Sequence, residues 1–178
     1  MALEHHGLVA RQDDGRFVLG PQIGHWAQQV DSLRTRAEGI VLHLRDQTGE
    51  SAQVYRRSGP DRLCIAAAEP AMGLRDTVPV GALLSMAAGS AAQVLAAWLP
   101  AAERADLVHR AAFSEGDLAN VRSRGWAHSI GQREPGVASL SAPVHSPAGN
   151  VVAAVSISGP IERLSRPSAA QRRALILA

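Results

Sequence analysis

Residues 137–160, VASLSAPVHSPAGNVVAAVSISGP, decide the fold of this chain, because they predict two apolar β-strands joined by a tight turn. Pro147, Gly149 and Asn150 are residue types that turns favour, and they separate the two strands. In the second strand, residues 151–158, successive side chains point to opposite faces. One face is core, and the other is apolar except for two serines.

The register of this hairpin determines which hydroxyls lie together, since a shift of one residue moves every side chain to the opposite face. A four-residue turn pairs Ser146 with Val151, Ser141 with Ser156, and Ser139 with Ser158. Four hydroxyls then gather on one patch of sheet, as a small polar ligand requires. The alternative is that each serine only fits under a helix and bonds a neighbouring backbone group, and the residues leave both interpretations open.

The composition favours one domain with room for a small appendage, since 46% of the 178 residues are hydrophobic. The net charge is +2, and all eighteen basic residues are arginine, which does not by itself make a nucleic-acid-binding surface. A single cysteine, Cys64, excludes a disulfide within the chain and favours a reducing cytoplasm. No apolar run is long enough to cross a membrane, and the first residues are not typical of a signal peptide.

The first twenty residues predict the end of a helix at residues 2–6, stopped by Gly7, and then a two-stranded ribbon with Asp14 and Gly15 at its turn. Arg11 and Arg16 flank the tip of that ribbon. So small a unit cannot bury a core alone, and we expect it to be the tail of something larger.

Further along, apolar residues at three- and four-residue steps predict one long helix or two over residues 21–47. The rest of the chain predicts strands at 51–57, 63–67 and 126–132, and helices at 85–98, 101–110, 115–124 and from 168 onward. Gly89 and Ser90 lie near the start of the helix predicted at residues 85–98. Free N–H groups there suit a carboxylate, although small residues also allow a close helix crossing.

Catalytic and metal-binding motifs are missing from the sequence. It contains no G-x-G-x-x-G, P-loop, H-E-x-x-H or paired cysteines, and its histidines have no partner at ligand spacing. The hairpin serines do not lie in a nucleophile elbow. We therefore expect neither a cofactor nor a metal.

Seven segments, in the same order, resemble the IclR-type bacterial transcriptional regulators over nearly the whole chain. They are LEHHGLVARQDDGRFVLG, TGESAQV, LRDTVPVG, AQVLAAWL, NVRSRGWA, REPGVASLSAPV and GNVVAAVSISGPIERL. Each segment alone is a weak signal, and their shared order makes the resemblance specific. It implies an α+β fold, a GAF-like (PAS-like) effector-binding domain with an antiparallel sheet flanked by helices, over residues 48–178. It also implies that residues 1–20 are the recognition-helix end and wing of a winged helix-turn-helix, with residues 21–47 as linker helix and first sensor helix.

The resemblance further implies that a small organic acid is held by backbone amides at a helix start and by side chains on the sheet. The corresponding positions are Gly89, Ser90, Ser129, Ser139, Ser156 and Ser158, with apolar walls at Leu74, Leu84, Met86 and Val137. In relatives the position of Ser129 can be acidic and that of Ser139 a cysteine, whereas both are serine here. The wing would contact DNA weakly through Arg11 and Arg16.

The expected function is therefore a cytoplasmic ligand sensor rather than an enzyme, acting as a homodimer or tetramer on DNA through the full-length winged helix domain. Two alternatives come from other classes. A small hydrolase or transferase in the same pocket would need a nucleophile with a nearby base. A pure dimerisation module would have a pocket closed by its own side chains.

Overall fold

The computed structural model describes residues 2–178, except for the side chains of residues 26–32. The chain divides into two compact units, Met1–Arg36 and Ala37–Ala178. The division expected from the sequence, into residues 1–20, 21–47 and 48–178, stays a prediction.

The first unit contains the predicted helix end and ribbon. Helix α1 (Ala2–His5) stops at Gly7, whose φ of 66° suits a glycine, and strands β1 (Val9–Arg11) and β2 (Phe17–Leu19) pair antiparallel. The turn is the predicted one, because the Asp14 side chain accepts the Arg16 N–H and Gly15 has a φ of 85°.

Helix α2 (Pro21–Thr48) is one continuous helix, which settles the choice between one helix and two. Gly39 lies inside it without breaking it, and Gly49 follows its end with a φ of 69°. The apolar residues Trp26 and Val30, which belong to the predicted stripe, lie outside the described side chains. In the second unit, α2 contributes buried Ala37, Val41 and Leu44.

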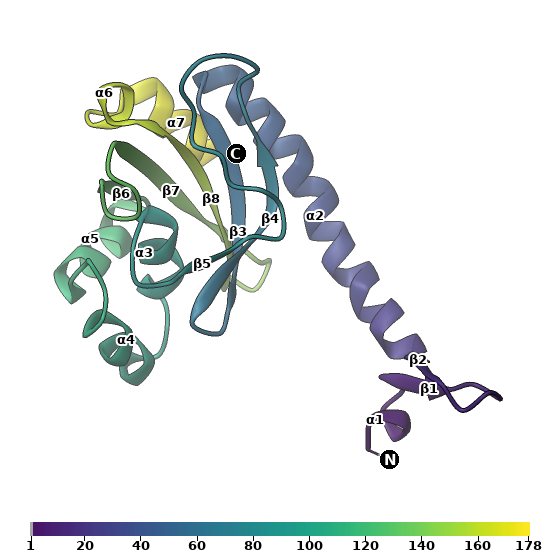
Figure 1. Cartoon of the computed structure of the whole chain (residues 1–178). Helices are drawn as coiled ribbons and strands as arrows, with labels where there is room; N and C mark the ends of the chain where they lie inside the picture. The colour runs from purple at the N-terminus through teal and green to yellow at the C-terminus, as the bar shows by residue number, and fades with distance from the viewer. Residues whose placement is uncertain (1) are drawn as a thin grey trace. The chain divides into compact units, whose positions relative to one another are not determined.

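The second unit is built on a six-stranded antiparallel sheet, drawn in Figure 1, with the strand order β5-β4-β3-β8-β7-β6. Its strands are β3 (Ser51–Ser58), β4 (Asp61–Ala68), β5 (Leu83–Ser85), β6 (Ala127–Ile130), β7 (Val137–His145) and β8 (Val151–Pro160). The central pair, β3 and β8, joins two hairpins that are far apart in the sequence. This arrangement is the α+β fold expected from the sequence.

Helices cover both faces of the sheet. On one face, α3 (Ser90–Ala97) packs against β6, β7 and β8, and against α4 (Ala101–Val108) and α5 (Glu115–Arg124). On the other face lie α6 (Ile161–Leu164) and α7 (Ala169–Leu177), which contact β7 and β8. His128 lies on this second face and its Nε2 is 2.9 Å from the Leu164 carbonyl oxygen.

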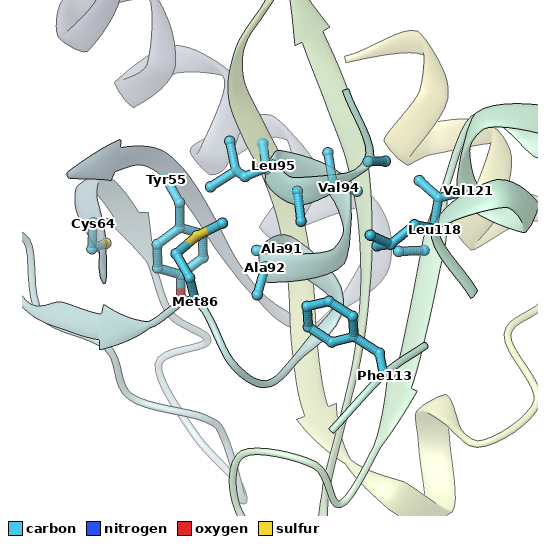
Figure 2. Packing of buried hydrophobic residues seen from close by; sticks show 14 of the residues in the cluster. Tyr55, Cys64, Met86, Ala91, Ala92, Val94, Leu95, Phe113, Leu118 and Val121 are labelled. Carbon is cyan, nitrogen blue, oxygen red and sulfur yellow. The ribbon is translucent and has the colours of Figure 1, made fainter. Parts of the chain in front are cut away.

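A hydrophobic cluster fills the space between α3 and the sheet. All eight residues of α3 are buried, from Ser90 to Ala97. Figure 2 shows α3 in the middle of the cluster, with Tyr55, Cys64 and Met86 to one side and Phe113, Leu118 and Val121 to the other. The small alanines of α3 allow the helix to lie close to the strands, and this places its N-terminus against the serine face.

Two short elements were not predicted, namely β5 and α6. Residues 85–89, predicted as helix, are not helical, because α3 begins at Ser90 and Leu83–Ser85 pair with β4 as an edge strand. The hairpin turn also differs from the prediction: His145, and not Ser146, pairs with Val151. The turn is thus one residue longer than predicted. A bulge in β8 compensates for this extra residue, so the serines beyond the bulge pair as predicted.

Candidate functional site

The serine face of the sheet is formed where three neighbouring strands meet. Ser139 on β7 pairs with Ser158 on β8 and with Ser129 on β6, while Ser141 pairs with Ser156. The predicted register is thereby confirmed, with Ser141 on the same face as the others. Leu140 and Ile157, which alternate with the serines, are fully buried and point to the opposite face.

Four hydroxyls of this face and the hydroxyl of Ser90 form one continuous chain of hydrogen bonds, named here the serine chain. In order, the Oγ–Oγ distances are 3.0 Å for Ser129–Ser139, 2.7 Å for Ser139–Ser90, 2.7 Å for Ser90–Ser141 and 2.5 Å for Ser141–Ser156. Ser90 is the first residue of α3, so the chain ties the helix start to the sheet.

The serine chain has more protons than contacts. Each hydroxyl donates one proton, so five hydroxyls joined by four contacts leave one proton for a further acceptor. The contacts can converge on any one of the five hydroxyls, and that hydroxyl keeps the free proton. Ser129 Oγ already accepts the Ser90 N–H at 3.1 Å. An acceptor in front of Ser156 selects the arrangement in which every contact runs toward Ser156.

The backbone amides at the start of α3 already have acceptors within the protein. The Gly89 N–H donates to Gln132 Oε1 at 3.1 Å, and the Ser90 N–H donates to Ser129 Oγ. Gln132 is held in turn by Gln93 and by the Ala112 carbonyl oxygen. The expectation that these two amides are open to an anion is thus corrected, because side chains of the β6 region occupy them.

Beside the serine chain lies a second polar group, formed by β3 and β4. The Ser158 hydroxyl donates to Gln53 Oε1 at 3.1 Å, and Gln53 is 1% exposed. Arg62 is 3% exposed, its guanidinium carbon lies 5.4 Å from the centre of the Tyr55 ring, and Nη1 donates to the Ser85 carbonyl oxygen. Burial lowers the pKa of Arg62 to about 10, so the side chain keeps its charge at neutral pH.

A buried ion pair completes the polar surround. Arg133 Nη2 lies 2.6 Å from each carboxylate oxygen of Asp76, whose exposed fraction is 8%. Asp76 belongs to the segment between β4 and β5, and Arg133 to the loop between β6 and β7. The pair thus joins two segments that are far apart in the sequence.

These groups enclose a cavity of about 20 Å³, room for roughly one water molecule. Its lining consists of Gln53, Tyr55, Arg62, Asp76, Gly89, Ser90, Ala91, Arg133, Ser139, Ser156 and Ser158. Five of the six predicted binding residues line this cavity, and the sixth, Ser129, bonds to Ser139 and Ser90 just behind it. The structure therefore brings them together, and their part in binding stays a prediction.

The four predicted wall residues lie elsewhere. Leu74 is 78% exposed, whereas Met86 is 1% exposed and packs in the hydrophobic cluster. Leu84 is an edge-strand residue on β5, and Val137 begins β7 opposite Pro160. The cavity is walled instead by polar side chains and by Tyr55, because the start of α3 presses close to the sheet.

Six lining residues were missed by sequence reasoning: Gln53, Tyr55, Arg62, Asp76, Ala91 and Arg133. An arginine one residue into a strand, directly after a turn, is ordinarily exposed, and the pattern around Arg62 gave no sign of burial. Asp76 and Arg133 are 57 positions apart, and no local pattern connects them.

The two wing residues lie in the first unit. Arg11 is on β1, with its guanidinium carbon 5.8 Å from the centre of the Phe17 ring. Arg16 lies 3.7 Å from Asp14 and its side chain is 83% exposed. Both flank the ribbon tip as expected, and DNA contact by either stays a prediction.

Among the described residues, no helix is long and apolar enough to cross a membrane. The same residues contain no group of three or more histidine, cysteine, aspartate or glutamate side chains that could hold a metal ion.

Residues 25–178 match the family described as bacterial transcriptional regulator IclR C-terminal. The chain belongs to the IclR family. This IclR-family chain is 32% identical over 179 residues to the glycerol operon regulatory protein of Streptomyces griseus, covering 92% of this chain and 70% of that protein. It is 24% identical to the transcriptional repressor IclR of Escherichia coli (strain K12), in a match that covers 97% of this chain and 73% of that protein.

Solved structures of IclR-family proteins have the same fold. A transcriptional regulator from Rhodococcus sp. superposes with a TM-score of 0.71 at 25% identity, covering 99% of this chain and 76% of that one. An IclR homolog from Microbacterium hydrocarbonoxydans, complexed with 4-hydroxybenzoate, superposes with a TM-score of 0.69 at 18% identity. The match covers 99% of this chain and 83% of that one. These relatives are named regulators or repressors and not enzymes, and the chain is the effector-binding domain of a transcriptional regulator.

Proposed function

We propose that this domain senses a small organic acid in the cavity beside the serine chain, and that the acid controls DNA binding by the attached winged helix-turn-helix. The observation that carries the proposal is that hydroxyls from β7, β8 and the start of α3 line one small cavity, with Ser129 of β6 bonded just behind them. A structural relative that holds 4-hydroxybenzoate supports an organic acid as the class of ligand.

Binding must open the cavity, since about 20 Å³ holds roughly one water molecule. The segments that carry Asp76 and Arg133 are joined across it by their ion pair, and an entering acid separates or repositions them. If the opened arrangement is the one that binds the acid, the acid shifts the population toward it. That differential affinity is what couples the cavity to the DNA-binding unit.

The remaining assignments belong to the same proposal. Residues 1–20 act as the wing and recognition-helix end, residues 21–47 as linker and first sensor helix, and residues 48–178 as the sensor. The full-length protein acts in the cytoplasm as a homodimer or tetramer, and light scattering of the purified protein measures that state. Since Arg11 and Arg16 alone contact DNA weakly, operator binding by this chain should be poor in a gel-shift experiment.

A pure dimerisation module is the second candidate, and the small volume of the cavity is the observation that favours it. The hydrolase alternative has less support. The serines of the cavity bond to one another, and its carboxylate, Asp76, is held by Arg133. The names of the relatives do not favour an enzyme either.

The test compares acid binding by the wild type and by the double variant Ser156→Ala/Ser158→Ala. Isothermal titration with a panel of small organic acids should give micromolar binding to the wild type and at least tenfold weaker binding to the variant, because two hydroxyls of the cavity are lost. Ser123→Ala, an exposed serine on α5, is the matched control. Equal binding of an acid by both proteins would show that the site is elsewhere, and no binding by the wild type would favour the dimerisation module.

A further inference from the structure

We propose that Arg62 and Gln53 bind the carboxylate of the effector, and that the cavity selects acids with a single negative charge. The inference rests on the proposed function and assigns the anchoring group of that site. It moves the anchor from the helix start to strands β3 and β4.

The cavity contains donors that have no acceptor. Arg62 Nε and Gln53 Nε2 are buried and have no hydrogen-bond partner among the described residues. Both residues line the cavity, at 3% and 1% exposure. Such groups are rare in native proteins, and each calls for a partner. Since both atoms can only donate, the missing partner is an acceptor.

The charge of Arg62 also has no salt-bridge partner among the described residues. No carboxylate of the described residues lies within salt-bridge distance of its guanidinium, which contacts the Tyr55 ring and the Ser85 carbonyl oxygen instead. Its planar group matches the geometry of a carboxylate better than an ammonium would. A carboxylate is therefore the acceptor that satisfies both the open donor and the charge.

The number of charges at the cavity limits the ligand to one carboxylate. Arg133 is the other arginine among the described lining residues, and its charge is cancelled by Asp76 at 2.6 Å. One positive charge, that of Arg62, is left for the ligand. A second carboxylate would have to displace Asp76 or lie beside it, and like charges at short range repel.

The serine chain supplies the second contact. One hydroxyl proton of the chain is left without an acceptor, and Ser156 can present it to the cavity. A further oxygen on the ligand, as in a hydroxy or keto acid, can accept it. The structure thus assigns the effector to monocarboxylic acids that carry at least one more oxygen.

The first experiment uses wild-type protein and matched pairs of probes. Titration calorimetry compares lactate with lactamide and 4-hydroxybenzoate with 4-hydroxybenzamide, and includes succinate as the dicarboxylate. We expect at least one acid to bind roughly 10- to 100-fold more tightly than its amide and than succinate, since the amide lacks the charge that strengthens bonds to Arg62. An amide that binds as tightly as its acid, or succinate that binds best, overturns the inference.

The second experiment changes the anchors. Gln53→Leu and Arg62→Lys should each weaken the bound monocarboxylate about tenfold or more, while Arg57→Met, an exposed arginine of β3 paired with Glu103, should leave its affinity unchanged. Asp76→Asn frees the charge of Arg133 and keeps the shape of the side chain. It should raise the affinity for succinate relative to the monocarboxylate at least tenfold. An unchanged preference in Asp76→Asn contradicts the charge count.

The outcomes separate this inference from the proposed function. If no acid binds the wild type, the proposed function fails and the anchor fails with it. A second outcome is that an acid binds and that Ser156→Ala/Ser158→Ala weakens its binding, while the Gln53, Arg62 and Asp76 variants bind it as the wild type does. In that case only the anchor is wrong. Thermal melts of each variant without ligand show that the fold is retained.

Discussion

Gly89 is the residue on which the start of α3 depends. Its φ is 94°, a backbone conformation that side-chain-bearing residues rarely adopt, and a Cβ there would lie 3.2 Å from Arg62 Nη2. The sequence places Gly89 only near the start of a helix predicted over residues 85–98. The structure adds that the glycine is needed so that the helix can approach a buried arginine.

Gly89→Ala should lower the free energy of unfolding by about 1–3 kcal/mol, because it combines backbone strain with pressure on Arg62. Urea denaturation measures the change. Gly39→Ala is the matched control: it lies within α2 and has nothing within 4 Å of its added Cβ. It should be neutral or stabilise by up to about 1 kcal/mol. Equal effects of the two substitutions would contradict the account.

His128 makes stability depend on pH. Burial lowers the pKa of its imidazole below the ordinary 6.5, although the Leu164 carbonyl oxygen opposes that shift. Because the unfolded chain then binds the proton more readily, the free energy of unfolding falls as the pH drops below about 6.5, and the contribution is complete above that value.

Denaturation at pH 7.5 and 5.5 should therefore show a smaller loss of stability for His128→Gln than for the wild type. His109→Gln, a change at an exposed position, should keep the loss at the wild-type size. If His128→Gln loses as much stability between pH 7.5 and 5.5 as the wild type, the pH dependence arises from another group.

At this scale, alternation along each strand predicted which serines share a face, although the turn is one residue longer than predicted and a bulge in β8 restores the register. Ser139, Ser141, Ser156 and Ser158 follow from period two and the register of one hairpin. The burial of Arg62 could not be predicted, since it depends on the Tyr55 ring, the Ser85 carbonyl and the approach of α3. The last two are contacts between segments that no local pattern connects.

Among the elements, α5 is the one most strongly determined by local signals. Ser114 accepts the Asp117 N–H while the Asp117 carboxylate accepts the Ser114 N–H, and Gly125 ends the helix with a φ of 80°. These signals are adjacent in the sequence, so the bounds of α5 are the predicted ones. Strand β5 and helix α6 have no such signals, because three or four residues are ordered only by what they pack against.

Ser114→Ala should destabilise the protein by about 1 kcal/mol, through loss of one side-chain partner of the helix N-terminus. The midpoint of urea denaturation measures the effect. Ser123→Ala, on the exposed side of the same helix, should change the midpoint little, since alanine is a good helix former and no cap is lost. A Ser123→Ala loss as large as that of Ser114→Ala would mean that the capping box contributes little.

For the whole molecule, the order of seven segments predicted the fold more securely than any one element did. The order carries information about which strands and helices occur together, and the six-stranded sheet with helices on both faces agrees with it. The volume of the cavity was beyond prediction, because it depends on how closely α3 packs on the sheet.

The fragment 37–178 should fold alone, since the hydrophobic cluster and every residue that lines the cavity belong to it. Circular dichroism should show a cooperative melt, and any acid that raises the melting temperature of the whole chain should raise that of the fragment by a similar amount. A fragment that melts without cooperativity, or that no longer responds to the acid, would mean that Met1–Arg36 supports the sensor directly.

The serine chain has a consequence for how the domain could register an occupant. Each O–H dipole must point along the row toward the one hydroxyl whose proton is free, so the row acts as one coupled unit across three strands and the start of α3. An oxygen placed before Ser156 draws every dipole toward Ser156, so that Ser129 donates to Ser139. Occupancy is thus recorded in proton order as well as in the opening of the cavity, and Ser90→Ala would divide that record into two independent halves.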